Sequence, residues 1–307
     1  MLAAYLDESV DAKFPQRSYV VGSVIGAYPV AYELGRRWGR LLERVGIAHF
    51  KASDCYRGRG EFARFVATPG EPTLQEQVRL DANGLEFTTL IASPASEANR
   101  CIAQSVTVDQ ADFRNLVMQN PIAKHVLGPD PYRLAYALAM ILCAWTVNEL
   151  KGISKPAQNQ LVTIMCDSHT AHSDQALGAY QGLLAANPEA SHHLGSYSML
   201  DDKSCPQLQA ADLIAFELRH AQAADLEGRT DRLREAFQLL MANHVVHIMT
   251  RAAREQLENI VRTHNPGEPY TLADVMAMRY EGDIALGTNP ASGGDPGQRD
   301  GSHLLLS

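Results

Sequence analysis

The stretch Leu2–Ser9, LAAYLDES, constrains the fold most, because it leads a buried run directly into charge. Residues 2–6 are apolar or aromatic, which predicts a short buried strand, and the adjacent carboxylates Asp7 and Glu8 follow at once. Burying a carboxylate is costly unless it meets a metal ion, another cation or water. The two acids therefore either open a surface turn or belong to a polar site at the end of the strand.

A second run of the same kind ends on a third carboxylate. Residues 160–167, QLVTIMCD, are again rich in apolar and β-branched side chains, and Asp167 closes the run. Because neighbouring strand residues point to opposite faces, Asp7 and Glu8 face one site together only if the chain turns at Glu8. The two strands predict carboxylates at their ends, with Glu8 as a further candidate.

Residues 204–216, SCPQLQAADLIAF, add a carboxylate on a helix. Ser204 is followed three residues later by a Gln, with a Pro in the first turn, which is a signature of a helix start. Asp212 lies among the apolar residues of this helix, and Gln209 shares its face. Two carboxylates at strand ends and one on an inward helix face are the arrangement of a hard-cation site.

These stretches resemble the DUF3800 family, whose members are proteins of uncharacterised function with a ribonuclease H-like fold. The resemblance rests on YLDES at residues 5–9, on HFKASD at residues 49–54, on the strand that ends at Asp167 and on the Q-x-x-D helix, its most specific element. By motif order it covers residues 1 to about 222. In this family a Gly usually follows D-E-S, whereas Val10 stands there in this chain.

The resemblance implies an α/β fold with a ribonuclease H-like mixed sheet flanked by helices, and the order of elements predicted from the sequence agrees with it. We expect one domain over residues 1–222 with a helical insertion at 93–130. A helical extension at 223–281 would pack on this domain, and a Gly- and Pro-rich tail at 282–307 would be disordered. The predicted elements are strands at 2–7, 17–27, 85–92, 160–167 and 194–200 and helices at 29–45, 132–150, 173–186 and 204–216.

The charge is unevenly distributed along the chain. The 27 Lys and Arg residues against 35 Asp and Glu give a net charge of −8, but residues 36–64 carry eight basic and three acidic side chains. A local basic surface of this kind can contact the phosphates of a nucleic acid on an acidic protein, although a solvated amphipathic helix gives the same pattern. The candidates for substrate contacts are Lys51, His49, Arg57 and Arg59.

The five cysteines are odd in number and scattered without a C-x-x-C pair, which favours reduced thiols in a cytoplasm over disulfides or structural zinc. No signal peptide is expected, because acidic residues interrupt the early apolar run. The longest uncharged run, Leu134–Asn148, is too short to span a bilayer. In CDSHTAHSD, the spacing of His169 and His172 fits no regular zinc pattern, so His169 is more plausible as a polar neighbour or proton shuttle.

The chemistry predicted from these patterns is metal-assisted hydrolysis of phosphodiester bonds. The catalytic candidates are Asp7, Glu8, Asp167 and Asp212, with Asp7, Asp167 and Asp212 holding Mg²⁺ or Mn²⁺. The residues expected to contact these ligands and hold them in position are Gln209, Ser204 and His169. DNA or RNA is the expected partner. Two alternatives remain open, namely a catalytically silent ribonuclease H-like binding or regulatory protein, and a hydrolase of small phosphoesters.

Overall fold

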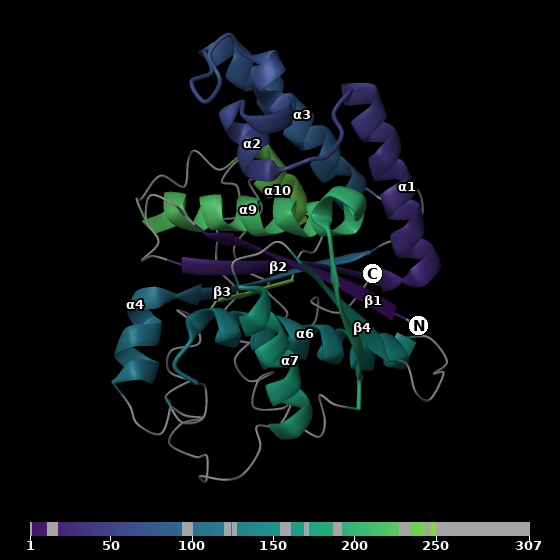
Figure 1. The fold of residues 1–307 in the computed structure, drawn as a ribbon, viewed down its shortest axis with the longest axis vertical. Helices are drawn as coiled ribbons and strands as arrows, with labels where there is room; N and C mark the ends of the chain where they lie inside the picture. The colour runs from purple at the N-terminus through teal and green to yellow at the C-terminus, as the bar shows by residue number, and fades with distance from the viewer. Residues whose placement is uncertain are drawn as a thin grey trace, which may run out of the picture.

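The computed structural model describes residues 2–10, 18–93, 101–119, 124, 128–153, 161–168, 172–186, 192–226, 234–242 and 246–249. Within them the chain forms a six-stranded mixed sheet with helices on both faces (Figure 1). The strand order across the sheet is β5-β4-β1-β2-β3-β6. Strands β1 and β4 are neighbours in the sheet but not consecutive in the sequence. They are parallel, so the chain must cross over between them, and the helices form this connection. The protein is therefore of the α/β class.

The first strand lies at the centre of the sheet. It pairs antiparallel with β2 on one side and parallel with β4 on the other, and β3 is antiparallel to β2. The outer strands β5 and β6 are parallel to β4 and β3, respectively, so among the six described strands β2 alone runs against the others. The bounds are β1 Leu2–Val10, β2 Ser18–Ala27, β3 Ile102–Asp109, β4 Val162–Asp167, β5 Leu194–Leu200 and β6 Val246–Met249.

The helices form a layer on each face of the sheet (Figure 1). On one face α9 lies directly on β1 and β2, and α1, α2, α3 and α10 cover it from outside. On the other face α6 packs against the central strands and α7 packs on α6. The bounds are α1 Tyr28–Val45, α2 Ala52–Arg57, α3 Leu74–Ala92, α4 Gln110–Asp112, α6 Pro131–Ile153, α7 Ser173–Ala186, α9 Pro206–Leu226 and α10 Glu235–Ala242, with short turns η1 Gly60–Phe65, η3 Phe113–Met118 and η4 Asp202–Ser204.

Most of the predicted elements are confirmed. The strands predicted at 2–7, 17–27, 160–167 and 194–200 and the helices predicted at 29–45, 132–150, 173–186 and 204–216 are all present, with ends shifted by a few residues and α9 running on to Leu226. The Ala-rich helix α6 is buried along its described first half, as the lack of charge there predicted.

The predicted third strand is wrong. Residues 85–92 form the end of α3, which begins with a capping box in which Thr73 and Glu76 bond to each other's backbone. Leu80, Phe87 and Ile91 are buried at helical spacing along it. The true third strand is β3, which lies inside the stretch predicted as an insertion, so the 93–130 insertion is wrong as well.

The polar composition of β3 explains that error. Its side chains Gln104, Ser105 and Thr107 are polar yet fully buried. The amide of Gln104 donates to the hydroxyl of Thr146 on α6, and that hydroxyl in turn donates to the carbonyl of Leu142 at 2.9 Å. Buried polar groups with such partners are stable in a core, so a central strand here does not need an apolar sequence.

The C-terminal region contributes a strand as well as a helix. Helix α10 packs on α3 and α9, and β6 extends the sheet beside β3, whereas the sequence predicted a purely helical extension at 223–281. Residues 250–307, including the tail predicted to be disordered, lie outside the described residues. None of the helices in the described ranges has the length and apolar character needed to cross a bilayer.

Gly22 sets the distance between α9 and the sheet. It lies in β2 opposite Asp7, and a Cβ on it would meet the backbone of α9, at the carbonyl oxygen of Ala211 and, at 2.7 Å, the nitrogen of Ala215. A real Cβ does not approach backbone atoms so closely. The absence of a side chain at this position therefore lets α9 lie on β1 and β2, and it fixes how near Asp212 comes to Asp7.

We expect Gly22→Ala to lower the free energy of unfolding by about 1–3 kcal/mol, because the added methyl group forces α9 away from the sheet. Gly39→Ala is the matched control, since a Cβ there meets nothing within 4 Å and α1 gains an alanine in a helix. Urea unfolding of both variants measures the difference. Equal stabilities would show that α9 does not pack this closely at Gly22.

Candidate acidic site on the α9 face of the sheet

Asp7 and Asp167 lie side by side on the face of the sheet that α9 covers. The parallel strands β1 and β4 pair Leu6 with Cys166, so the next residue of each strand is adjacent to the other. Tyr5, two residues before Asp7, packs with Leu208 of α9, which places Asp7 on that face. Asp7 is 1% exposed and Asp167 is 5% exposed. Two carboxylates are thus buried next to each other.

Asp212 and Lys51 complete the centre of this site. Asp212 projects from α9, and its Oδ1 lies 3.3 Å from the Lys51 ammonium, which also lies 3.8 Å from Oδ2 of Asp7. The other oxygen of Asp212 accepts a hydrogen bond from the backbone nitrogen of Ala52 at 2.8 Å. The charge of Asp212 is the main cause that raises the pKa of Lys51 above its usual value. Lys51 is therefore a cation shared by two aspartates from different elements.

Gln209 holds the chain around Lys51 in place. Its Oε1 accepts hydrogen bonds from the indole nitrogen of Trp38 at 2.9 Å and from the backbone nitrogen of Phe50 at 3.0 Å. The ring of Phe50 is buried in an aromatic cluster with Trp38 and Phe87. Gln209 and Asp212, one helical turn apart, thus bond the backbone on either side of Lys51 to α9. The Q-x-x-D motif is a clamp for the 49–54 segment.

One oxygen of Asp7 is buried without a hydrogen-bond donor. Its Oδ1 accepts from the backbone nitrogen of Glu8 at 2.8 Å, while Oδ2 has no hydrogen-bond partner among the described residues. Burial raises the pKa of Asp7 well above its usual range, the Lys51 charge opposes this, and the neighbouring carboxylates of Asp212, Glu8 and Asp167 add to the rise. An ionised Asp7 thus needs more positive charge than Lys51 provides.

Glu8 lies on the opposite face of the sheet, so its predicted place beside Asp7 among the catalytic carboxylates is wrong. Strand β1 continues in regular register to Val10 without the turn that would bring Glu8 round. Its carboxylate accepts a hydrogen bond from the hydroxyl of Tyr136 on α6. Burial raises the pKa of Glu8 and the Tyr136 hydrogen bond opposes the rise. The Val at position 10 is compatible with this straight strand.

Two further acids near the site are not among the site residues predicted from the sequence. Asp54 of α2 and Asp202 of η4 are half-buried, and burial raises the pKa of both. For each of them the charges of Lys51 and His49 lower the pKa and that of Asp212 raises it. Asp54 follows Lys51 by three residues within HFKASD, and Asp202 precedes α9. The position of Asp202 follows from the clamp, because its backbone carbonyl accepts a hydrogen bond from Gln209 at 2.8 Å.

The sequence matches no family model and has no significant match among curated proteins. The resemblance to the DUF3800 family therefore stays a prediction. What holds without it is the α/β fold with its mixed sheet and the geometry of the acidic site.

The remaining predicted site residues are less central. The Ser204 hydroxyl donates to the carbonyl of Asp201 at 3.0 Å, so Ser204 shapes the turn before α9. Nδ1 of His49 lies 4.0 Å from a carboxylate oxygen of Glu61. Arg57 ends α2, and Arg59 lies against Gly70. His169 lies outside the described residues.

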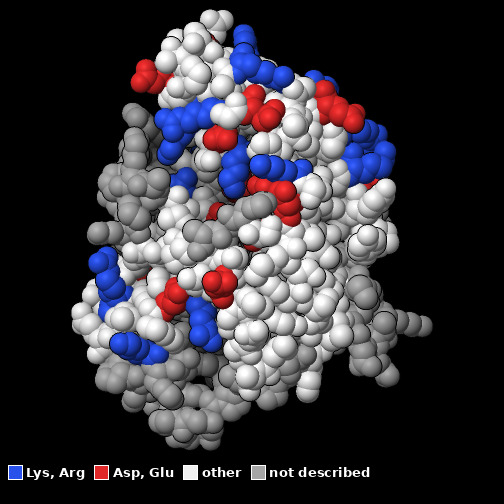
Figure 2. All heavy atoms as spheres, in the orientation of Figure 1, with Lys and Arg blue, Asp and Glu red and all other residues white. Residues whose placement is uncertain are grey.

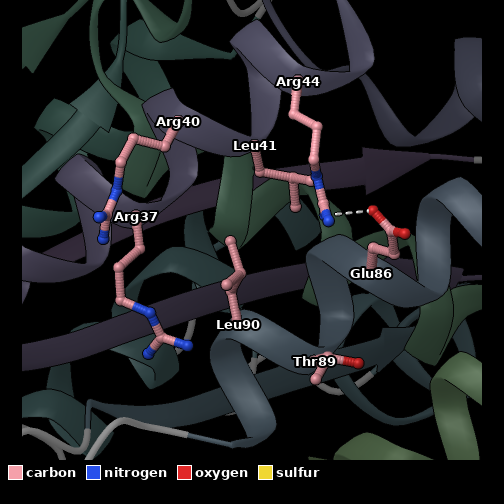
Figure 3. A pocket seen from close by; sticks show the side chains of 7 residues that line it. All are labelled: Arg37, Arg40, Leu41, Arg44, Glu86, Thr89 and Leu90. Atoms are coloured by element: carbon pink, nitrogen blue, oxygen red, sulfur yellow. Dashed lines mark hydrogen bonds and ion pairs between the residues drawn. The ribbon is translucent and has the colours of Figure 1, made fainter.

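The basic residues of 36–64 are partly gathered at a groove between α1 and α3 (Figure 3). The groove has a volume of about 460 Å³, and Arg37, Arg40 and Arg44 line it above the apolar side chains of Leu41 and Leu90. The Arg44 guanidinium is paired with Glu86 across the groove, and that of Arg37 bonds to the Ser93 carbonyl at 3.3 Å. Arg40 makes no hydrogen bond or ion pair with the described part of the chain.

Basic and acidic side chains are mixed on the face seen in Figure 2 and gather over the upper part of the molecule, where α1, α2 and α3 lie. The basic groove belongs to α1 and α3, whereas the carboxylates come from β1, β4 and α9. Of the cationic residues predicted to contact substrate, Lys51 is the one whose ammonium pairs with the central aspartates.

No three His, Cys, Asp or Glu side chains among the described residues already form a metal-binding group. The donor set nevertheless fits a hard divalent cation, because it consists of carboxylate oxygens and one of them, Oδ2 of Asp7, is buried without a donor.

Proposed function

We propose that this chain is a ribonuclease H-like nuclease that hydrolyses phosphodiester bonds with the help of Mg²⁺ or Mn²⁺. The observation that carries the proposal is the buried Oδ2 of Asp7, which lacks a hydrogen-bond donor, in a residue that neighbours Asp167 and shares Lys51 with Asp212. The strand order β5-β4-β1-β2-β3, with β4 and β5 parallel to β1, supports the ribonuclease H-like assignment. The DUF3800 resemblance of the clamp helix agrees with it.

Asp7 and Asp167 are the residues that would hold the cation, with Asp212 beside them. When bound, such a cation supplies positive charge that activates a water and stabilises the leaving oxygen. In the reaction the oxygen of a water forms a bond to phosphorus and the bond from phosphorus to the leaving oxygen breaks. The leaving oxygen takes up a proton, and the proton of the water passes to solvent.

The chain's own contribution is to orient the phosphate. Lys51 is one-third exposed at its side chain, so its ammonium faces both the aspartates and the surface and can donate to a phosphate oxygen. The clamp of Gln209 and Asp212 fixes the backbone from which Lys51 projects. Preorganised charge of this kind stabilises the transition state without reorganisation at the moment of reaction.

The basic groove supports a nucleic acid as the substrate. Arg40 is exposed and makes no hydrogen bond or ion pair in the described ranges, and Arg37 is bound to a neutral carbonyl, so both guanidinium groups can contact phosphates. Such contacts act on the backbone and are independent of base sequence. We infer that the polymer is held partly by the α1–α3 face while the acidic site acts on one phosphodiester.

The test is cleavage of labelled single- and double-stranded DNA and RNA with Mg²⁺, Mn²⁺ or EDTA. We expect cleavage of at least one polymer with either metal and none with EDTA. The carboxylates and the phosphate are all negatively charged, so a metal cation is needed to offset their repulsion. A small phosphodiester such as bis-p-nitrophenyl phosphate belongs in the same panel. Cleavage of that compound without any polymer would favour a small-substrate hydrolase instead.

A second candidate function is a catalytically silent binding protein with the same fold. It is favoured by Lys51, which already places one positive charge between Asp7 and Asp212, as an internal counter-ion would. Binding of nucleic acid with no cleavage under any metal condition would select this candidate. The salt dependence of that binding would then report the number of phosphate contacts.

A further inference from the structure

The feature that distinguishes this site from a plain carboxylate cluster is the lysine inside it. The ammonium of Lys51 lies 3.3 Å from Oδ1 of Asp212 and 3.8 Å from Oδ2 of Asp7, although the three residues come from a loop, a helix and a strand. The side chain is one-third exposed, whereas those of both aspartates are nearly buried. Lys51 therefore approaches the carboxylates from the open side.

The carboxylate oxygens of Asp7 and Asp212 differ in what they already contact. Asp212 is engaged at both oxygens, by the Ala52 nitrogen at 2.8 Å and by the Lys51 ammonium. Asp7 is engaged at Oδ1 by the Glu8 nitrogen, and its Oδ2 has the longer ion pair but no hydrogen bond among the described residues. The oxygen without a hydrogen bond thus belongs to Asp7, and the parallel pairing of β1 with β4 makes Asp167 the neighbour of that residue.

Like charges explain why Asp212 is a poor place for a metal ion. A divalent cation bound at Asp212 would lie within a few ångströms of the Lys51 ammonium, which is 3.3 Å from Oδ1 of Asp212, and like charges that close repel each other strongly. In two-metal nucleases the ions are about 3.5–4 Å apart and act on the two sides of one phosphate. Here the Lys51 ammonium occupies the neighbourhood of the second position.

We propose that the site takes one divalent cation, held by Asp7 and Asp167, and that Lys51 supplies the positive charge that a second metal ion would otherwise supply. The proposal rests on the proposed function, since it concerns the same site. Lys51 is a positioning and charge-providing residue for the phosphate, and Asp212 serves to orient Lys51. The other half-buried acids near Lys51, Asp54 and Asp202, add to the negative charge that this lysine offsets.

The clamp gives Lys51 the fixed position that this role requires. A surface lysine has many rotamers, so its charge is spread over a large volume. Here the backbone nitrogens of Phe50 and Ala52 are both bonded to α9, and the ring of Phe50 is buried 4.4 Å, centroid to centroid, from that of Phe87. The residue between these two anchors can change its side-chain rotamer but not its place over the aspartates.

The experiment counts Mn²⁺ ions bound to the full chain, by calorimetric titration and by electron paramagnetic resonance, which detects the magnetic coupling of two Mn²⁺ ions a few ångströms apart. We expect one uncoupled ion per chain for the parent protein. Lys51→Met, which keeps length and removes charge, should bind a second ion and show the coupled signal. Lys51→Arg, the matched control that keeps the charge, should bind one.

Each outcome has a distinct meaning. Two coupled ions on the parent protein would overturn the role of Lys51 and leave the proposed nuclease standing. No bound ion on the parent would overturn the proposed function together with this inference. If Lys51→Met binds one ion as the parent does, Lys51 does not occupy a metal position. If Lys51→Met does not fold without metal, its melting temperature in Mn²⁺ decides, because a variant that admits two ions must gain more stability than the parent.

Discussion

Asp7→Asn is expected to lower metal-dependent cleavage of nucleic acid by at least about 100-fold while leaving binding of the polymer nearly unchanged. Loss of a residue that merely supports a metal ligand costs about 10–100-fold, so loss of a ligand costs at least as much. Binding persists because Arg37 and Arg40 on α1 are untouched by the change. Initial rates of cleavage and filter binding in the same buffer measure the two effects.

The fold of Asp7→Asn should be as stable as that of the parent, or more stable, when metal is absent. Burial raises the pKa of Asp7 because the ionised form is disfavoured there, and Asn removes the ionisable group. Mn²⁺ should raise the melting temperature of the parent but not of the variant. Asp174→Asn, at an exposed position of α7, is the control and should behave as the parent does. Equal cleavage by Asp7→Asn and the parent would refute the proposed role of Asp7.

The parts of the fold that could be predicted from the sequence are those whose burial follows a regular apolar pattern. Strands β1 and β4 are nearly continuous apolar runs that end on acids, and their parallel pairing places Asp7 beside Asp167. Helix α9 shows its start in Ser204 and Pro206 and its buried faces in its spacing. The sequence predicts that these three elements converge, because buried carboxylates need a cation or polar partners, and one site can provide these for all of them.

Strand β3 could not be predicted in this way, because its pattern is not apolar. Gln104, Ser105 and Thr107 are buried, and Gln104 bonds to Thr146 on α6, a partner 42 residues away that no local rule supplies. The error at residues 85–92 was avoidable, since Thr73 and Glu76 form the T-x-x-E signature of a helix start. A helix that begins there continues through the β-branched residues of 85–92, which on their own suggest a strand.

The site was predicted in its aspartates but not in its cation. Lys51 was expected to contact substrate from the surface, whereas it is paired with Asp7 and Asp212, which are 44 and 161 positions away in the chain. Asp202 gave no sequence signal, because an acid before a helix is ordinarily a cap. Glu8 belongs to the site only if the chain turns there, and the regular strand to Val10 places it on the other face.

The substitution with the largest expected effect on stability is at Gln209, which bonds the 49–54 segment to α9. Its Oε1 accepts from two buried donors, the indole nitrogen of Trp38 and the backbone nitrogen of Phe50. In Gln209→Leu, a change of similar volume, both donors lose their acceptor, and each buried unsatisfied group costs about 1–3 kcal/mol. We therefore expect the free energy of unfolding to fall by about 2–6 kcal/mol, measured by urea unfolding.

The same substitution should also weaken Mn²⁺ binding and cleavage, because the 49–54 segment loses one of its two bonds to α9 and Lys51 loses its fixed position. Gln75→Leu, at an exposed position in the first turn of α3, is the control and should change stability by less than about 0.5 kcal/mol. Gln209→Leu with the parent's stability would show that the hydrogen bonds of Gln209 are not made in solution. A destabilised variant with the parent's Mn²⁺ affinity would instead separate the clamp from the metal site and restrict Gln209 to folding.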